Sequence, residues 1–350
     1  MSGTTGFVDW EFAKATGARL VPAGPTVTAE EARAEVAAIR VAAARAHDPV
    51  ANTSRLHTPD DAPPVAVVDR AVWIAANADT MAALLDPVVA KMMATRAGQT
   101  PAAVAAVGGK MTGGEAGAML AFMATKVLGQ YDLAPQSTPQ LLLVAPNIVA
   151  VQRDLGLDAV DFRQWVCLHE ETHRVQFTAV PWLRPHMLER TRTLAEDLAP
   201  DPDAVTERFR QLATRLPEVF REGGQGITDL LTTPEQRAEL AKVTAVMSLL
   251  EGHADVVMDE VGPAVIPTVA AIRATFDERR KGVGAFDRIL RRLLGLEAKM
   301  RQYRDGAVFV RGVVDRVGWD GFNAVWTSPD TLPLPAEIEE PAAWVARVHG

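Results

Sequence analysis

The sequence contains little cysteine, few aromatic residues and no excess of positive charge. Its single cysteine, Cys167, cannot form an internal disulfide, and its first residues have neither the basic nor the apolar segment of a secretion signal. Both features are typical of a reducing compartment, and we expect a cytoplasmic location. Acidic residues outnumber basic residues by 44 to 36, which gives a net charge of −8 and disfavours a nucleic-acid partner.

The sequence also lacks an apolar run that could span a membrane. The longest candidate, residues 101–129, is interrupted by Lys110, Glu115 and Lys126, so we expect no membrane partner. Apolar residues make up 48% of the 350 residues and charged residues 23%, as in soluble chains that bury a core without disulfides. Nothing in this composition indicates an oligomeric state.

Local signals predict a mainly α-helical chain with at most a small β-ribbon. Thr28 and Glu31 form a capping box at the start of a helix that we expect to end before Pro49. Residues 139–146 are a short apolar run bounded by prolines, which predicts a strand at a sheet edge. Further helices are expected at about 68–85, 158–180, 186–198, 203–215, 234–260, 264–281, 285–302 and 306–317.

The sequence shows no linker long enough to separate independent domains. We expect an N-terminal helical region, residues 1–135, packed on a metal-binding catalytic region, residues 136–350, in one compact unit. Residues 329–341 carry four prolines and are expected to lie extended over the surface. Small residues at helical spacings predict that two helices approach each other closely: Gly109, Gly113, Gly114 and Gly117.

His169, Glu170 and His173 form the motif H-E-x-x-H. On a helix, residues four apart share a face, so both imidazoles can reach one metal ion. Glu170 is then placed to take a proton from a water that the metal activates and to pass it to a leaving amine. Apolar residues recur at spacings of three and four around the motif, which predicts that the histidines face inward. The competing interpretation is a pair of half-buried core histidines that bind no metal.

A second segment, residues 250–255, offers the third ligand that a catalytic zinc requires. Glu251 can bind the metal, while Asp255, four residues later on the same face, can accept a hydrogen bond from the outer nitrogen of a ligating histidine. His253 is the rival third ligand, but it lies on the other side of that helix. A di-iron site is disfavoured, because Ala254 stands where such a site needs a histidine.

The neighbours of the motif are expected to have other roles. Glu171 and Arg174 are charged, so we expect both to point to solvent, whereas Cys167 lies on the opposite side of the helix and is expected in the core. Amide hydrolysis also needs a group that stabilises an oxyanion. Tyr303 and His186 are candidates for this role, although both more often serve structure, and we retain Tyr303 as the candidate catalytic residue.

The segment Trp165–Trp182, which contains the motif, resembles an uncharacterised actinobacterial family of zincin-like metallopeptidases. Its members are often labelled as zinc-dependent metalloproteases associated with deazaflavin-coenzyme biosynthesis. The resemblance implies a mostly helical, zincin-type core with His169 and His173 as zinc ligands and Glu170 as the base, but it implies no substrate. It covers most of the chain from about residue 100, and it includes Val8–Trp10, Leu142–Asn147, Leu250–Asp255, Lys299–Tyr303 and Gly321–Pro329.

We therefore predict a zincin-like metallopeptidase with an active-site helix and a second, ligand-bearing helix. It would hold one Zn²⁺ through His169, His173 and Glu251 and hydrolyse a peptide or amide bond, with Glu170 as base and then acid and Asp255 orienting a ligand. One alternative is a catalytically silent zinc-binding structural or interaction protein, which a site closed by four protein ligands would favour. Another is a hydrolase of small amides, which uses the same chemistry and differs only in the shape of its cleft.

Overall fold

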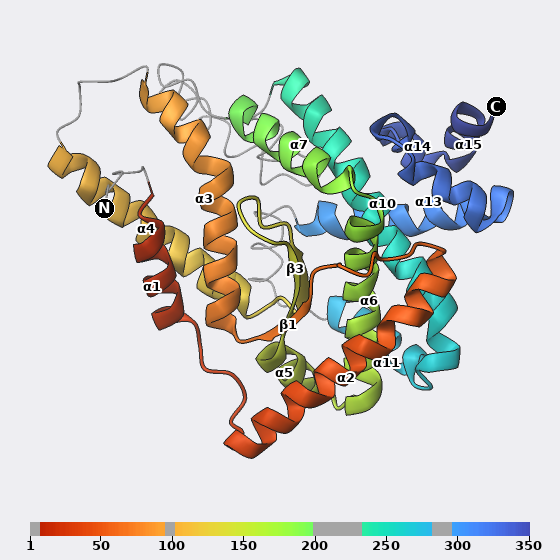
Figure 1. Cartoon of the computed structure of the whole chain (residues 1–350), viewed down its shortest axis with the longest axis horizontal. Helices are drawn as coiled ribbons and strands as arrows, with labels where there is room; N and C mark the ends of the chain where they lie inside the picture. The colour runs from red at the N-terminus through yellow and green to blue at the C-terminus, as the bar shows by residue number, and fades with distance from the viewer. Residues whose placement is uncertain (1–7, 95–101, 199–232, 282–295) are drawn as a thin grey trace.

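The computed structural model describes residues 8–94, 102–198, 233–281 and 296–350. It is mostly helical and has one small sheet, which confirms the predicted fold class (Figure 1). The long helices are α1 (Trp10–Leu20), α2 (Ala29–Ser54), α3 (Arg70–Ala94), α4 (Ala102–Ala124), α5 (Ala145–Leu155), α6 (Ala159–Ala179), α7 (Leu183–Leu198), α10 (Pro234–Val265), α11 (Val269–Lys281) and α13 (Leu296–Phe322). Four short helices follow: η1 (Asn323–Trp326), η2 (Pro329–Thr331), α14 (Pro335–Glu339) and α15 (Pro341–His349).

The sheet has three strands in the order β1-β3-β2, namely β1 (Val65–Val68), β3 (Gln140–Val144) and β2 (Gly129–Asp132). Strand β3 confirms the predicted strand, but its predicted place at the edge is wrong, because β1 pairs with it in parallel and β2 antiparallel. The four residues from Leu141 are all buried, as expected for a strand covered on both faces. Pro139 and Pro146 lie just outside the strand, so neither removes a hydrogen bond from the ladder.

Helices α6 and α10 begin at strong capping residues. The Asp158 side chain accepts hydrogen bonds from the first N–H groups of α6, and Thr233 forms a capping box with Gln236 at the start of α10. The other carboxylate in the first turn of α6, Asp161, accepts two hydrogen bonds from Thr268, just before α11. The predicted start of the motif-bearing helix is thus confirmed, and α6 ends at Ala179, as expected.

Two helices continue through a proline, past the ends that were predicted for them before Pro49 and at about residue 85. The capping box of α2 is confirmed, but the helix continues through Pro49 to Ser54, and α3 likewise continues through Pro87. An internal proline costs a helix about 3 kcal/mol. In α2 the turn after Pro49 is buried at Val50 and Ala51, so tertiary packing offsets this cost. Within the same turn, Ser54 Oγ donates to Val50 O.

The C-terminal part is more helical than predicted. Residues 329–341 are not extended, because η2 and α14 form there and the buried Trp344 on α15 donates its indole N–H to Thr331 O. The two helices expected at 285–302 and 306–317 are joined in α13 from Leu296 onward, with a kink at Gly318, whose φ is 70°. The predicted helix at 203–215 and the start of that at 285–302 lie outside the described residues.

The predicted close approach of glycine-bearing helices is confirmed for α1 and α4. A Cβ atom at Gly113 or Gly117 would overlap the backbone of Asp9 or Ala13. Helix α3 packs on α1, α4 and α7. Among the described helices its window Arg70–Ala90 is the one long and apolar enough to cross a membrane, a judgement that rests on length and composition alone.

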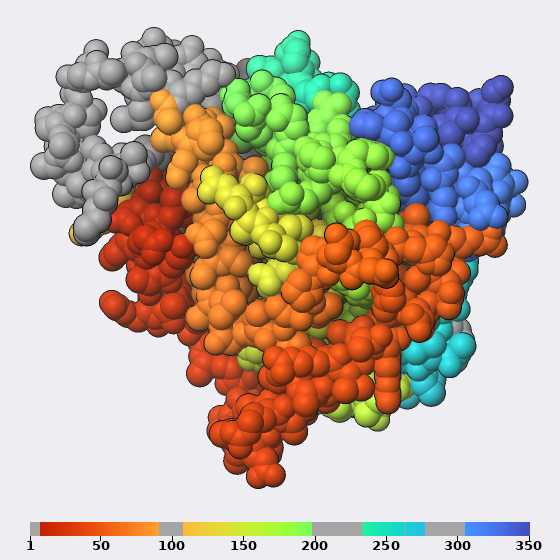
Figure 2. Space-filling view, viewed as in Figure 1, coloured from red at the N-terminus to blue at the C-terminus, as the bar shows by residue number. Residues whose placement is uncertain are grey.

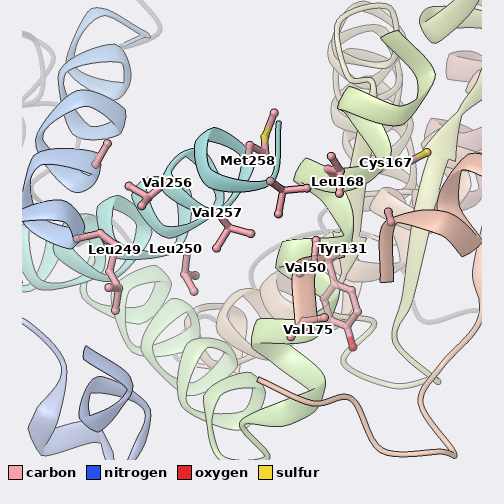
Figure 3. Close-up of a cluster of buried hydrophobic side chains, with 14 of the residues drawn as sticks. Val50, Tyr131, Cys167, Leu168, Val175, Leu249, Leu250, Val256, Val257 and Met258 are labelled. Carbon is pink, nitrogen blue, oxygen red and sulfur yellow. The ribbon is translucent and has the colours of Figure 1, made fainter. Parts of the chain in front are cut away.

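The main core lies where α6, α10 and α2 meet. Leu168 and Val175 of α6 pack with Leu250 and Val257 of α10, as Figure 3 shows. Helix α2 and the loop after it lie across the front of the molecule and contact α6 (Figure 2). The expected division at residue 135 stays a prediction; β1 lies before it and pairs with β3 after it.

Candidate metal centre

Helices α6 and α10 bring three of the predicted ligands together. His169 and His173 lie one turn apart on α6, and their Nε2 atoms are 3.3 Å from each other. Glu251 on α10 places Oε2 3.5 Å from each of these nitrogens. All three side chains are at least three-quarters buried, so the donor atoms meet below the surface.

The donor set fits a zinc ion. Two imidazole nitrogens and one carboxylate oxygen are the ligands of many catalytic zinc sites. With bonds of about 2.0–2.2 Å, the edges of a zinc tetrahedron are about 3.3–3.6 Å long. The separations of 3.3, 3.5 and 3.5 Å between the three donor atoms match these edges. Three ligands leave the fourth position of a tetrahedron for water or substrate.

The charges around the three donors favour a cation. Burial alone would lower the pKa of His173, but Glu251 and Glu170 outweigh this effect and raise it to about 9. Burial alone would raise the pKa of Glu251, but the two histidines hold it below its ordinary value. A group of side chains that attracts a proton this strongly also attracts a metal ion, which takes the place of that proton.

Glu170 is held against the first residue of β2. The side chain is almost fully buried, and a Cβ atom at Gly129 would lie 2.6 Å from its Cδ atom, so only glycine leaves room for the carboxylate. Burial raises the pKa of Glu170, while the neighbouring His169 and His173 lower it. A carboxyl group with a raised pKa beside a metal site suits a residue that accepts and returns a proton.

The outer nitrogens of both histidines have partners. His169 Nδ1 lies 3.3 Å from Met258 Sδ, and His173 Nδ1 lies 3.0 Å from Gln176 Oε1. A hydrogen bond from either histidine to Asp255 would have to replace one of these contacts. Burial raises the pKa of Asp255, and the electrostatic interaction with the nearby His169 opposes this rise.

His253 does not join the three donor atoms. It is fully buried, stacks on Phe322 with ring centroids 5.4 Å apart, and makes edge contacts with Trp319 and Trp326. Burial, with the charge of His173 adding to it, lowers the pKa of His253 to about 3, so the ring is neutral. Of the two predicted candidates for the third ligand, the structure therefore brings Glu251 to the histidines.

The prediction that Glu171 and Arg174 point to solvent is wrong. The Glu171 side chain is 1% exposed, and Arg174 donates to both of its oxygens, at 2.9 and 3.0 Å. His47 from α2 lies 2.8 Å from the same carboxylate, and Arg174 also donates to Pro63 O. The two charged residues therefore bind α6 to α2 and to the loop before β1, because each supplies the other with the partner that burial requires.

The remaining predicted residues either lie apart from the three donor atoms or fall outside the residues that the structure describes. Cys167 is buried and contacts Ile39 O, which confirms its place in the core. His186 packs edge-on against Trp182 and lines a different pocket with Arg190 and Lys242. The Tyr303 side chain lies outside the described residues, although its backbone belongs to α13, so its catalytic role stays a prediction.

Three residues close to the centre were not predicted as functional: Gln176, Met258 and Gly129. Gln176 follows His173 by three residues on the inward face of α6, and this spacing is the signal that could have identified it. Met258 lies one turn after Ala254 on α10 and carries no such signal. Gly129 meets Glu170 through the pairing of β2 with β3, which no local pattern indicates.

Comparisons with known proteins agree with this geometry. The sequence model of a family described as zincin-like metallopeptidases matches residues 8–345. The crystal structure of a protein described as a candidate hydrolase with a novel fold, from Chloroflexus aurantiacus, has a TM-score of 0.68 and 30% sequence identity, over 98% of this chain and 99% of that one. Among curated proteins none matches the chain. By its sequence from residue 8 to residue 345, the chain belongs to the zincin-like metallopeptidase family.

Proposed function

We propose that the protein is a zinc-dependent hydrolase that cleaves a peptide or amide bond. The observation that carries this proposal is the meeting of His169 Nε2, His173 Nε2 and Glu251 Oε2 beside the buried carboxylate of Glu170. Zinc in such a site supplies Lewis acidity, which activates water and polarises a carbonyl group. The family supports a metallopeptidase, and the predicted cytoplasmic location is part of the proposal.

Glu170 is the proton carrier in the proposed reaction. It takes one proton from the water whose oxygen bonds to the carbonyl carbon, and it gives this proton to the amine nitrogen as the C–N bond breaks. Gly129 limits where the carboxylate can lie, because the Glu170 side chain occupies the space that a Cβ atom at Gly129 would fill. Tyr303 is the proposed group that stabilises the oxyanion, and Asp255 is proposed to support His169 electrostatically. The proposal includes no deazaflavin site, because none of the described contacts at the centre indicates one.

Zinc content tests the site directly. Protein purified without chelator is expected to contain about one zinc per chain by elemental analysis, and His173→Ala is expected to contain almost none, because two remaining ligands bind zinc weakly. His186→Ala is the matched control, since this histidine lies in another pocket, and it should retain the metal. If the unaltered protein takes up no zinc even when zinc is added, the proposed function is wrong.

Gly129→Ala tests the position of the base without touching a ligand. The new methyl group would displace the Glu170 carboxylate, and we expect turnover to fall by about 100-fold, as a misplacement of 1 Å causes in other enzymes. The zinc content should not change. Gly108→Ala is the control, because its new methyl group meets no atom within 4 Å. Equal turnover of the two variants would show that Gly129 does not position the base.

A further inference from the structure

Gln176 contacts three groups that belong to two helices. It is fully buried on α6, one turn after His173. Its Oε1 atom lies 3.0 Å from His173 Nδ1, and its Nε2 atom lies 2.9 Å from Leu250 O and 2.8 Å from His253 Nδ1. Leu250 immediately precedes Glu251 on α10, so one amide group contacts one metal ligand and the backbone beside another.

The backbone oxygen of Leu250 determines which groups donate and which accept in these hydrogen bonds. Leu250 O is a backbone carbonyl, which can only accept, so the atom of Gln176 that faces it is the NH₂ group. The carbonyl oxygen of the side chain therefore faces His173, whose Nδ1 must carry the hydrogen that it donates. Once a metal ion takes the place of the other proton, His173 keeps its hydrogen on Nδ1 and has its lone pair on Nε2, the atom that faces Glu251.

The same amide group fixes the state of His253. Both hydrogens of the Gln176 NH₂ group are donated, one to Leu250 O and one to His253 Nδ1, so this nitrogen must accept. The hydrogen of His253 is then on Nε2, which is buried and has no hydrogen-bond partner among the described residues. The rings of Trp319, Phe322 and Trp326 surround it and hold the imidazole in place through aromatic contacts.

We propose that Gln176 is the positioning residue of the metal centre, because its amide group presents the Nε2 lone pair of His173 to the metal and ties this ligand to the helix that carries Glu251. This inference rests on the proposed function. It assigns to the amide the role that carboxylates and backbone carbonyls have behind many zinc-bound histidines. Here the partner is neutral and is itself held by His253 and by the C-terminal aromatic residues. Side-chain contacts thus connect Phe322 on α13 to His253 on α10, His253 to Gln176 on α6, and Gln176 to the ligand His173.

Two substitutions separate the hydrogen bond to His173 from the bonds to α10. Gln176→Met keeps the length and most of the volume of the side chain but removes every hydrogen bond. Gln176→Glu keeps an acceptor for His173 Nδ1 but loses the donor to Leu250 O. Gln164→Met is the matched control: Gln164 lies on the same helix, is buried, and its Nε2 has no hydrogen-bond partner among the described residues.

The measurements are zinc affinity, by competition with a chelating dye, and the visible spectrum of the Co²⁺-loaded protein, which reports the geometry of the ligands. We expect Gln176→Met to bind zinc about 10–100-fold more weakly than the unaltered protein and to shift the Co²⁺ bands. Gln176→Glu should keep the zinc affinity within about threefold and retain the bands, because a carboxylate is a strong acceptor for a ligating histidine. Its metal-free form should nevertheless unfold at a lower urea concentration, because Leu250 O then faces a carboxylate.

This split between affinity and stability distinguishes positioning from packing. If Gln176 only fills space, zinc affinity will follow the stability of the metal-free protein in both variants. Gln176→Glu will then bind zinc no more tightly than its stability predicts. Zinc binding by Gln176→Met as tight as that of the Gln164→Met control would also overturn the proposal. In either case normal zinc binding by the unaltered protein leaves the proposed hydrolase intact. An unaltered protein that binds neither Zn²⁺ nor Co²⁺ would instead refute both proposals.

Discussion

Glu170→Gln is expected to remove most of the turnover while the zinc stays bound. Glutamine has the shape of glutamate, so it keeps the contact with Gly129 and leaves the three ligands in place. Its amide cannot take a proton from water and return it to the leaving amine. Proton transfer by a positioned side chain contributes about 10²–10⁴-fold to a rate, and a loss of this size in kcat is expected.

The measurement needs a substrate and a matched control. Mixtures of unstructured peptides, analysed by mass spectrometry, would identify one that the unaltered protein cleaves, and kcat would then be compared on that peptide. Glu30→Gln makes the same chemical change on the exposed first turn of α2 and should leave kcat and zinc unchanged. Undiminished turnover in Glu170→Gln would remove this residue from the mechanism. Loss of zinc together with turnover would mean that Glu170 helps to hold the metal.

The three residues of the candidate metal site could be predicted because their signals are local. His169 and His173 are four apart on a helix, and Glu251 stands in an apolar helical segment where a buried carboxylate needs a partner. Each signal lies within one helical turn. The chain then has only to bring α6 and α10 together, which their apolar faces at Leu168 and Val257 achieve.

The contacts that support these ligands could not be predicted because they join distant segments. Gln176 and His253 are 77 residues apart, and His47 and Glu171 are 124 residues apart. The buried position of Glu171 depends on where α2 crosses α6. A charged residue beside a motif therefore gives no local indication of whether it faces water or a partner across the core.

The errors in the helix boundaries have the same origin. A proline is a local signal, and at Pro49 it predicts an end that the packing of the following turn overrides. The apolar run in β3 indicates a strand, but whether one or two strands pair with it depends on β1, more than 70 residues earlier. Local patterns thus predict whether a segment is a helix or a strand better than they predict which other segments pack against it.

Arg174→Met is expected to lower the free energy of unfolding by about 3 kcal/mol. It leaves the carboxylate of Glu171, 1% exposed, without the two charge-assisted hydrogen bonds that it accepts from the guanidinium group. Removing one partner of a buried pair costs about 3–5 kcal/mol. The lower end applies because His47 still contacts the carboxylate.

Another Glu–Arg pair with the same spacing provides the control. Glu189 and Arg192 on α7 are also three residues apart, but both side chains are at least half exposed, and such pairs contribute about 0–1 kcal/mol. Urea unfolding of the metal-free proteins, followed by circular dichroism, would compare Arg174→Met with Arg192→Met. Equal losses in the two variants would mean that the buried ion pair does not hold α6 in place.

The double variant Glu171→Leu/Arg174→Met tests the cause of this loss. Replacing both members by apolar residues removes the uncompensated charge, so the double variant should be more stable than Arg174→Met alone. Some loss should remain, because Arg174 also donates to Pro63 O in the loop before β1. Zinc affinity should change little in either variant, since the Glu171 carboxylate contacts His47 and Arg174 rather than the metal ligands. These results would show that the ion pair holds α6 against α2, whereas Gln176, on another face of α6, orients His173.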